Sequence, residues 1–163
     1  MLSDAIGNID RHKGYYELLN NSLNDQISSY RRLIKLDIDR TAKGITIEIK
    51  QMMQRILYNF AKRNMEIAYC QGMNFICYFL IEMSFEEEEI FWILCYIFEI
   101  VMSKGYYINM TPVLADIDIF NQMLADKLPI IYNEVVKKGF DFNCLLIPHF
   151  VTIFTNLKNN KVS

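Results

Sequence analysis

The sequence predicts an all-α fold, and three observations support that prediction. Residues 50–65 place apolar side chains three, four, seven and eight positions apart, which is the spacing of a helix with one buried face. Ser84 followed by Glu87 is typical of a capping box at a helix start. Thr111 and Pro112 mark another start, because threonine caps helices and proline is tolerated in a first turn.

The other helices follow from apolar runs and from the residues that interrupt them. Residues 72–83 are apolar nearly all round, as in a helix at the centre of a core. The helix that begins after Ser84 is predicted to continue to about Met102 and to end before Gly105. The later segments are delimited by proline, glycine or polarity: Pro129 to Gly139, then 141–155 with Pro148 inside it, and a polar tail at 157–163.

One stretch alternates with the period of a strand. Apolar and polar residues alternate over 34–39 and again over 45–49, with a turn-like segment at 41–44 between them. By period alone this pattern predicts a β-hairpin. We nevertheless expect a helical arrangement, with a loop or helix start at 45–49, because of the family resemblance described below.

Composition and spacing exclude several classes of protein. The net charge of −2 argues against a general nucleic-acid binder, which needs excess positive charge to neutralise phosphates. The longest uninterrupted apolar run, Ile90–Phe98, is far shorter than the roughly 20 residues of a membrane span. His12 and His149 have no neighbour at ligand spacing, so no metal site is expected. The four cysteines form no CxxC pair, which favours buried, reduced thiols in a cytoplasmic protein.

Two short motifs, about thirty residues apart, carry the functional signal. They are Ile34-Lys-Leu-Asp37-Ile-Asp-Arg40-Thr41 and Tyr69-Cys-Gln71-Gly72-Met-Asn74. Together they resemble the IxxDxxRT and YxQGMN motifs of the TBC domain of Rab GTPase-activating proteins. The flanking sequence is also similar from about residue 14 to 156. The resemblance implies that residues 1–163 form one irregular, all-α TBC-like domain.

The resemblance also implies two catalytic fingers that are supplied to a partner. Arg40 matches the family's arginine finger and Gln71 its glutamine finger. Hydrolysis of GTP needs an oriented water and positive charge where the transferring phosphoryl group develops negative charge. A guanidinium is permanently charged and bridges phosphate oxygens, while an amide both donates and accepts hydrogen bonds and so can hold the water.

The remaining motif residues are expected to support the two fingers. Asp37 precedes Arg40 by three positions, so on a helix the two side chains are neighbours and Asp37 can orient the guanidinium. Asp39 is an alternative partner for Arg40. Gly72 allows close backbone approach beside Gln71. The full set of supporting residues is Ile34, Asp37, Thr41, Tyr69, Gly72 and Asn74.

The resemblance therefore implies an enzyme activator rather than a stand-alone enzyme. The expected partner is a Rab-family small GTPase in its GTP-bound form, at organelle or vesicle surfaces in the cytoplasm, where vesicle trafficking takes place. GTP and Mg²⁺ would be bound by the partner, so no cofactor is expected on this chain. Membrane association would be peripheral and only through partners. The alternative is a catalytically inactive TBC-like module that only binds a GTPase or another trafficking protein.

Four departures from the family pattern are visible. Ala68 stands where glycine is common, and His149 stands where tryptophan is usual and would need a hydrogen-bond partner if buried. Residues 41–49 lack the usual aromatic side chains. The family domain also continues through further helices, so we expect its C-terminal helices to be missing. An uncovered apolar face near 141–156 would then favour self-association.

Overall fold

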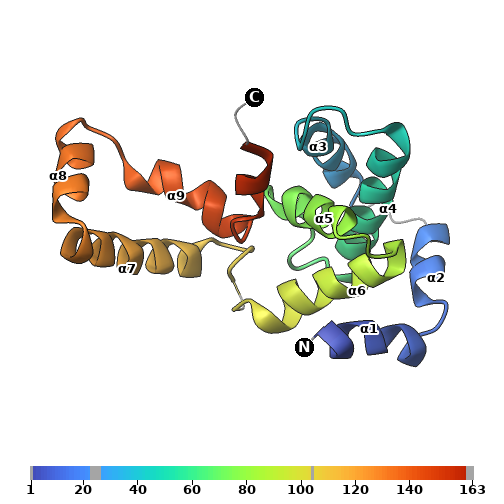
Figure 1. The fold of residues 1–163 in the computed structure, drawn as a ribbon. Coiled ribbons are helices and arrows are strands. Elements are labelled where there is room, and N and C mark those ends of the chain that lie inside the picture. Colours follow the sequence, from blue (N-terminus) through green and yellow to red (C-terminus); the bar gives the residue numbers. More distant parts are fainter. Residues whose placement is uncertain (1, 23–26, 104, 161–163) are drawn as a thin grey trace.

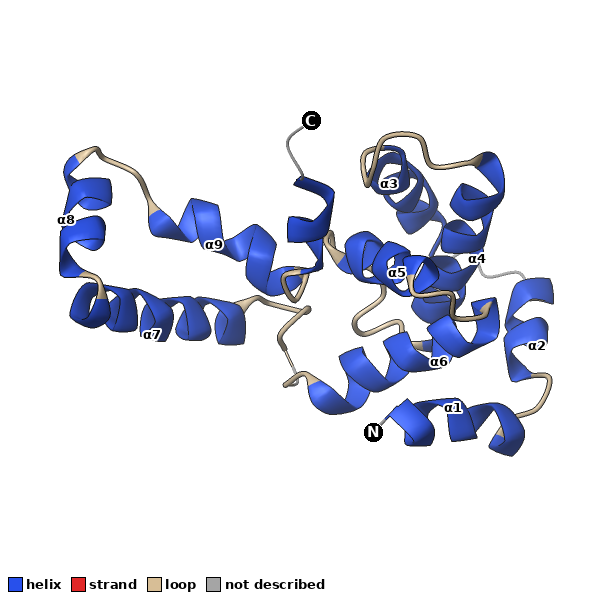
Figure 2. Ribbon diagram, in the orientation of Figure 1, coloured by secondary structure: helices blue, strands red, loops and turns tan. Residues whose placement is uncertain are grey.

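The computed structural model describes residues 2–22, 27–103 and 105–160, and within these ranges it contains helices and no strand (Figures 1 and 2). The all-α prediction is therefore confirmed. The α-helices are α1 (Leu2–Arg11), α2 (Tyr15–Asn21), α3 (Ser28–Asp39), α4 (Ile47–Arg63), α5 (Met73–Glu82), α6 (Glu87–Tyr96), α7 (Thr111–Lys127), α8 (Pro129–Lys137) and α9 (Phe142–Val151). A π-helical turn, Ile97–Val101, extends α6, and a 3₁₀ segment, Thr155–Asn160, follows α9.

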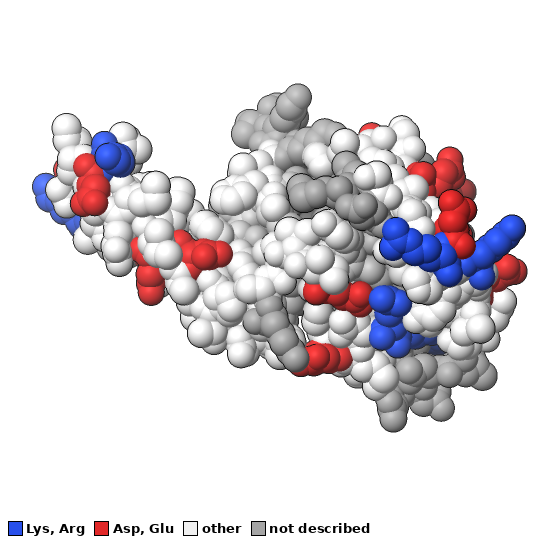
Figure 3. Space-filling view, turned by 90° about the horizontal axis from the view of Figure 1, so that it is seen from below, with Lys and Arg blue, Asp and Glu red and all other residues white. Residues whose placement is uncertain are grey.

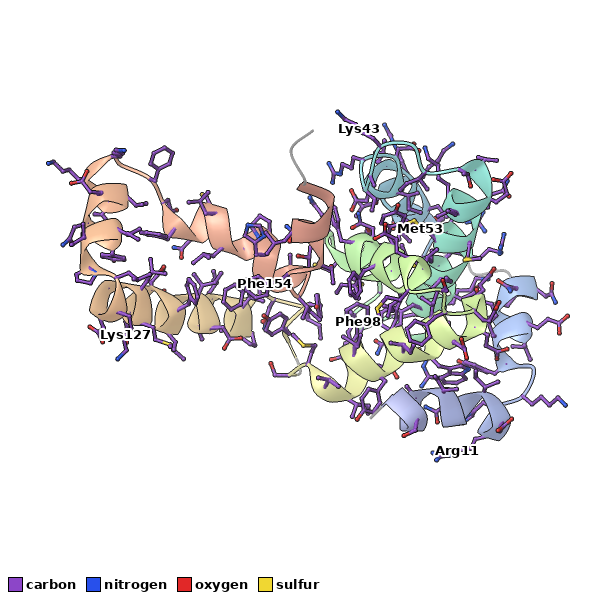
Figure 4. All side chains as sticks on the ribbon, in the orientation of Figure 1. Arg11, Lys43, Met53, Phe98, Lys127 and Phe154 are labelled. Atoms are coloured by element: carbon purple, nitrogen blue, oxygen red, sulfur yellow. The ribbon has the colours of Figure 1, made fainter. Side chains whose placement is uncertain are left out.

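Helix α4 forms the centre of a body made of α1 to α6. It contacts α2, α3, α5 and α6, while α1 packs on α6 (Figure 1). Its apolar face is completely buried, as the spacing within 50–65 predicts, and Met53 lies at the contact with α5 (Figure 4). Phe98 of the π-helical turn packs edge-on against Phe60 of α4 and against Tyr107, which leads the chain out of the body.

Helices α7, α8 and α9 form an arm that extends away from the body (Figure 1). Helix α8 has no buried residue, and α7 buries only Val113 and Ile117 near its start. The arm returns to the body through the segment after α9, which contacts α5, and Phe154 lies at this junction (Figure 4). In the view from below, basic and acidic side chains lie at the tip of the arm, and acidic side chains lie between that tip and the body (Figure 3).

The β-hairpin period at 34–49 does not produce strands. Ile34 and Ile38 are four positions apart on α3 and both face the core, whereas Leu36 between them is exposed. Helical spacing thus accounts for the buried residues better than alternation does. Thr46 caps α4 by accepting a 3.4 Å hydrogen bond from the Ile49 N–H, so 45–49 is a loop and helix start, as the resemblance implies.

The predicted capping box at Ser84 and Glu87 is wrong by two residues. The structure forms the box between Glu86 and Glu89, each side chain accepting from the other's backbone N–H. Ser84 instead ends α5 in the left-handed region, with φ of 63°, and donates its N–H to the Ile81 carbonyl at 2.9 Å. Ser84 and Glu86 are both able to cap a helix at this junction. Because Ser84 closes α5, it cannot also begin α6.

Other boundaries agree within about four residues. Helix α7 begins at Thr111 with Pro112 in its first turn, although Met110 rather than Thr111 occupies the cap position. Helix α9 contains Pro148, as expected. Helix α1 was not predicted at all. The polar tail is described only to Asn160, and 161–163 lie outside the described residues.

The cysteines are all free. Cys77 and Cys95 are buried, as predicted, and Cys70 is partly buried. Cys144 is exposed, and the prediction is wrong there because α9 lies in the arm, which has little core to bury it. In the part of the chain that the structure describes, no helix has both the length and the apolarity that crossing a bilayer requires.

Candidate functional site

Arg40 lies directly after the last residue of α3. Its guanidinium donates a hydrogen bond to the Asp37 carboxylate, which is completely buried, while the Arg40 side chain remains 56% exposed. The two residues are three positions apart, so the helix itself sets their contact. The structure thus holds an exposed guanidinium by a buried anion. The spacing predicts that the two side chains are neighbours, but not that Asp37 is buried.

Asp37 is held from several sides. Its second carboxylate oxygen accepts a 2.8 Å hydrogen bond from the Tyr69 hydroxyl, and its backbone carbonyl accepts a 2.8 Å bond from the Thr41 hydroxyl. Burial, followed by the hydrogen bond to the Asp37 carboxylate, raises the pKa of Tyr69 well above its usual value. Tyr69 therefore stays protonated and keeps donating, which fixes the carboxylate that orients Arg40.

Asn74 joins the two motifs. Its amide nitrogen donates to the Thr41 hydroxyl at 2.8 Å and to the Asp37 carbonyl at 3.3 Å, while its amide oxygen accepts the Gly72 N–H at 3.1 Å. Asn74 is completely buried, so each of these bonds forms away from water. The segment that carries Arg40 and the backbone beside Gln71 are therefore both hydrogen-bonded to one side chain.

Gln71 is exposed on a short turn before α5. The next residue, Gly72, has φ of 113°, which side-chain-bearing residues rarely adopt. A Cβ atom at Gly72 would lie 3.1 Å from Val151 Cγ2 and 3.3 Å from the Val151 carbonyl oxygen. Glycine is needed here both for its conformation and for the close approach of the segment that ends α9.

Asp39, the alternative partner for Arg40, is paired with another residue in the structure. Asp39 accepts a 2.7 Å hydrogen bond from Lys50 of α4 and makes no ion pair with Arg40. That hydrogen bond and the Lys50 charge lower the pKa of Asp39. The idea that Asp39 mispairs with Arg40 is therefore wrong, because Lys50 occupies it.

The departures from the family pattern have local explanations. Ala68 has φ of 50° and is buried, so it occupies the conformation that glycine adopts at lower cost. The ring of His149 is partly buried, and its Nδ1 lies 3.0 Å from the Asn156 side-chain oxygen, the kind of partner that a polar ring at this position needs. The motif residue Ile34 lies on the buried face of α3.

Sequence reasoning missed the contribution of the C-terminal half of the chain. A Cβ atom at Gly72 would lie within 3.4 Å of both Val151 and Thr152, and the Tyr107 hydroxyl donates a 3.2 Å hydrogen bond to the Val151 carbonyl. Gly72 itself indicated that another segment packs closely against this turn, since a glycine required for close approach implies a neighbour. No pattern in the sequence identifies which segment that is.

The site combines a charged donor and a neutral amide on two segments fixed to each other. Among the described residues there is no group of three or more histidine, cysteine, aspartate or glutamate side chains able to hold a metal ion. No side chain at the site has the arrangement of an activated nucleophile. Arg40 and Gln71 are exposed, and the residues behind them are buried and hydrogen-bonded.

Comparison with known proteins gives a consistent match. Residues 6–162 match the family model described as the Rab-GTPase-TBC domain. A TBC domain-containing protein of Schizosaccharomyces pombe is 31% identical over 159 residues, which cover 92% of this chain and 20% of that protein. The human growth hormone-regulated TBC protein 1 is 28% identical over 166 residues, covering 96% of this chain and 48% of that protein.

The fold also resembles a solved structure. The crystal structure of the Chlamydomonas flagellar RabGAP TBC domain superposes with a TM-score of 0.78 at 21% sequence identity, over 95% of this chain and 52% of that one. The chain therefore spans between a fifth and about half of the length of the proteins it resembles.

Proposed function

Because this chain belongs to the Rab-GTPase-TBC domain family, we propose that it accelerates GTP hydrolysis by a Rab-family small GTPase. One observation carries the proposal. Asn74 ties the hydroxyl of Thr41, the residue after Arg40, to the backbone N–H of Gly72, the residue after Gln71, and the side chains of Arg40 and Gln71 remain exposed. This arrangement suits two side chains that enter a partner's active site together.

In the proposed mechanism the chain binds the GTP-loaded partner and inserts Arg40 toward the phosphates. The guanidinium supplies positive charge where the transferring phosphoryl group and the leaving oxygen become more negative. Asp37 acts as a positioning residue, because it holds the guanidinium before the partner arrives and so lowers the entropy lost on docking. GTP and Mg²⁺ belong to the partner.

Gln71 has the complementary role. Its amide oxygen would accept a hydrogen bond from the attacking water, and its amide nitrogen would donate to a neighbouring oxygen. Gly72 and Asn74 fix the turn that carries it, so the amide is presented without a large rearrangement. We place this activity in the cytoplasm at organelle or vesicle surfaces, where the partner rather than this chain provides membrane attachment.

The test is single-turnover GTP hydrolysis by a panel of GTP-loaded Rab proteins. The wild-type chain should accelerate at least one of them, and Arg40→Ala should lower that acceleration by about 10³-fold or more, as expected for a finger supplied in trans. Gln71→Ala should also lower it strongly. Arg32→Ala on α3 and Gln51→Ala on α4 are matched controls, because both side chains are exposed and outside the two motifs.

A panel that gives background rates with the wild-type chain, or equal rates for wild type and both finger variants, would overturn the proposal. The exposed apolar side chains of α7 to α9 favour a second candidate, a module that binds a GTPase or trafficking protein without activating it. Binding of a GTP-loaded Rab with a normal affinity in both finger variants, together with no acceleration by the wild type, would support that candidate.

A further inference from the structure

A cavity of about 520 Å³ lies between α2, α3 and α4. Arg40, Asp37 and Gln71 do not line it, so it is separate from the two fingers. Its size falls within the range of small-molecule sites in proteins, roughly 300–1,000 Å³. Its walls include three basic side chains, Arg31, Arg55 and Lys62, together with several side-chain amides.

Two of these cations share one aromatic ring. The Arg31 guanidinium carbon lies 4.4 Å from the centre of the Tyr58 ring, and the Lys62 Nζ atom lies 5.1 Å from it. Burial, and then the charge of Arg31, lower the pKa of Lys62. The two positive groups therefore repel each other, and Tyr58 only partly offsets that repulsion.

The positive charge at Arg31 and Lys62 is not neutralised by the described walls of the cavity. No carboxylate is present among the described lining residues. Arg55 is paired with Glu87 through hydrogen bonds of 2.8 and 2.6 Å. Lys62 donates to the backbone carbonyls of Leu19 and, at 2.7 Å, Ser22, which are neutral. An anion inside the cavity would interact favourably with both cations at once.

Neutral donors complete the lining. Asn59 is buried and donates its amide to the Asn20 side chain at 2.6 Å, which fixes two amides at the wall of the cavity. Side-chain amides and a guanidinium donate several hydrogen bonds to phosphate oxygens, and a guanidinium does so in a bidentate geometry. The face of Tyr58 is in contact with cations, so it offers little room for stacking a nucleobase.

We propose that this cavity binds a small phosphate-bearing anion, of the size of a phosphorylated polyol, through Arg31 and Lys62. The ligand would be either a free phosphate compound or the headgroup of a phosphorylated lipid. The site is independent of Arg40 and Gln71, so it goes beyond the activation of a GTPase.

The test uses titration calorimetry of the full chain with inorganic phosphate and with inositol trisphosphate. Arg31→Gln should weaken binding of inositol trisphosphate by about tenfold or more, since one charge-assisted contact is lost. Arg32→Gln is the matched control, because Arg32 is the adjacent exposed arginine on α3 and does not line the cavity. It should change the affinity by less than about twofold. Lys62→Gln should weaken binding as Arg31→Gln does, provided thermal unfolding shows a folded protein.

A flotation experiment distinguishes the two sources. Binding to phosphatidylcholine vesicles that contain a phosphoinositide, lost in Arg31→Gln, supports a lipid headgroup. Binding of inositol trisphosphate without vesicle binding supports a free phosphate compound. Absence of binding to every probe, or equal weakening by Arg31→Gln and Arg32→Gln, would overturn the site, because either result shows that the cavity does not select the anion.

Discussion

Asn74 and Thr41 are joined by a hydrogen bond of 2.8 Å from the amide nitrogen to the hydroxyl, although they are 33 positions apart. Thr41 follows Arg40 directly, and Asn74 also accepts the N–H of Gly72, the residue after Gln71. The relative position of the two proposed fingers is thus fixed at a single buried amide. In the proposed mechanism, Arg40 and Gln71 would approach a partner as one unit.

Removal of this amide should be costly. Asn74→Ala leaves the Gly72 N–H without its acceptor and removes the donor to Thr41, so we expect the free energy of unfolding to fall by about 2–3 kcal/mol. Urea unfolding followed by circular dichroism measures the change. Asn133→Ala on the exposed surface of α8 is the matched control and should cost less than about 0.5 kcal/mol. Equal losses would mean that the bridge contributes nothing.

The left-handed conformation of Ala68 gives a second prediction. In Ala68→Gly, the relief of about 1–2 kcal/mol of backbone strain should offset the entropy gained by the unfolded chain and the lost methyl group. The free energy of unfolding should therefore change by less than about 1 kcal/mol. Ala61→Gly, at a buried position inside α4, should cost about 2 kcal/mol, because no strain is relieved there. A comparable loss in both variants would contradict the argument.

Buried thiols predict a loss of stability at alkaline pH. Burial raises the pKa of Cys77 and Cys95 well above the usual thiol value. Above about pH 8.5 the unfolded chain releases these protons and the folded chain retains them, so the free energy of unfolding falls as the pH rises. Between pH 8 and pH 10 each thiol should account for about 2 kcal/mol of that fall.

The measurement for this prediction is urea unfolding under reducing conditions at several pH values. Cys77→Ala should flatten the dependence above pH 8.5. Cys144→Ala should change it much less, because Cys144 is exposed and its pKa is raised mainly by the hydrogen bond to Asp141, which solvent screens. The same slope in the wild type and in Cys77→Ala would assign the effect to other groups, among them the buried tyrosines, whose pKa values are also raised.

The arm predicts self-association through its apolar side chains. Ile130 on α8 is 81% exposed, Phe140 just after α8 is 60% exposed, and α8 contains no buried residue. Sedimentation velocity over a range of concentrations should show species larger than the monomer. Ile130→Glu combined with Phe140→Glu should shift the protein toward the monomer. Ile100→Glu, at a 69% exposed position on the body, is the control and should not shift the protein toward the monomer. A wild-type protein that is monomeric at every concentration would refute the prediction.

Much of the fold was predictable because its helices follow local rules. The apolar stripe of α4, the apolar run of α5 and the prolines that open α7 and α8 are each encoded within a few residues. The errors occurred where two local rules compete. Ser84 is a good cap by composition, but the chain uses it to close α5. Alternation at 34–39 is a strand pattern, but burial of Ile34 and Ile38 on one helical face prevails.

The site was predictable to a smaller extent. The Asp37–Arg40 contact follows from spacing on a helix, and the close approach at Gly72 follows from the residue type. The pairing of Asp39 with Lys50 cannot be predicted from spacing or residue type, because it depends on how the loop brings α4 back to α3. The hydrogen bond from Asn74 to Thr41 depends in the same way on the packing of α5 against α3. Tertiary contacts of this kind have no local signature.

Because Gly72 allows close approach, the position of the turn that carries Gln71 depends on Val151, which lies near the other end of the chain. The backbone and side chain of Val151 back the turn that carries the glutamine, and Tyr107 holds Val151 in place. A proteolytic fragment that ended within the arm would retain every residue of both motifs. It would nevertheless lose the surface against which the glutamine turn is set, so an intact pair of motifs is not sufficient for an intact site.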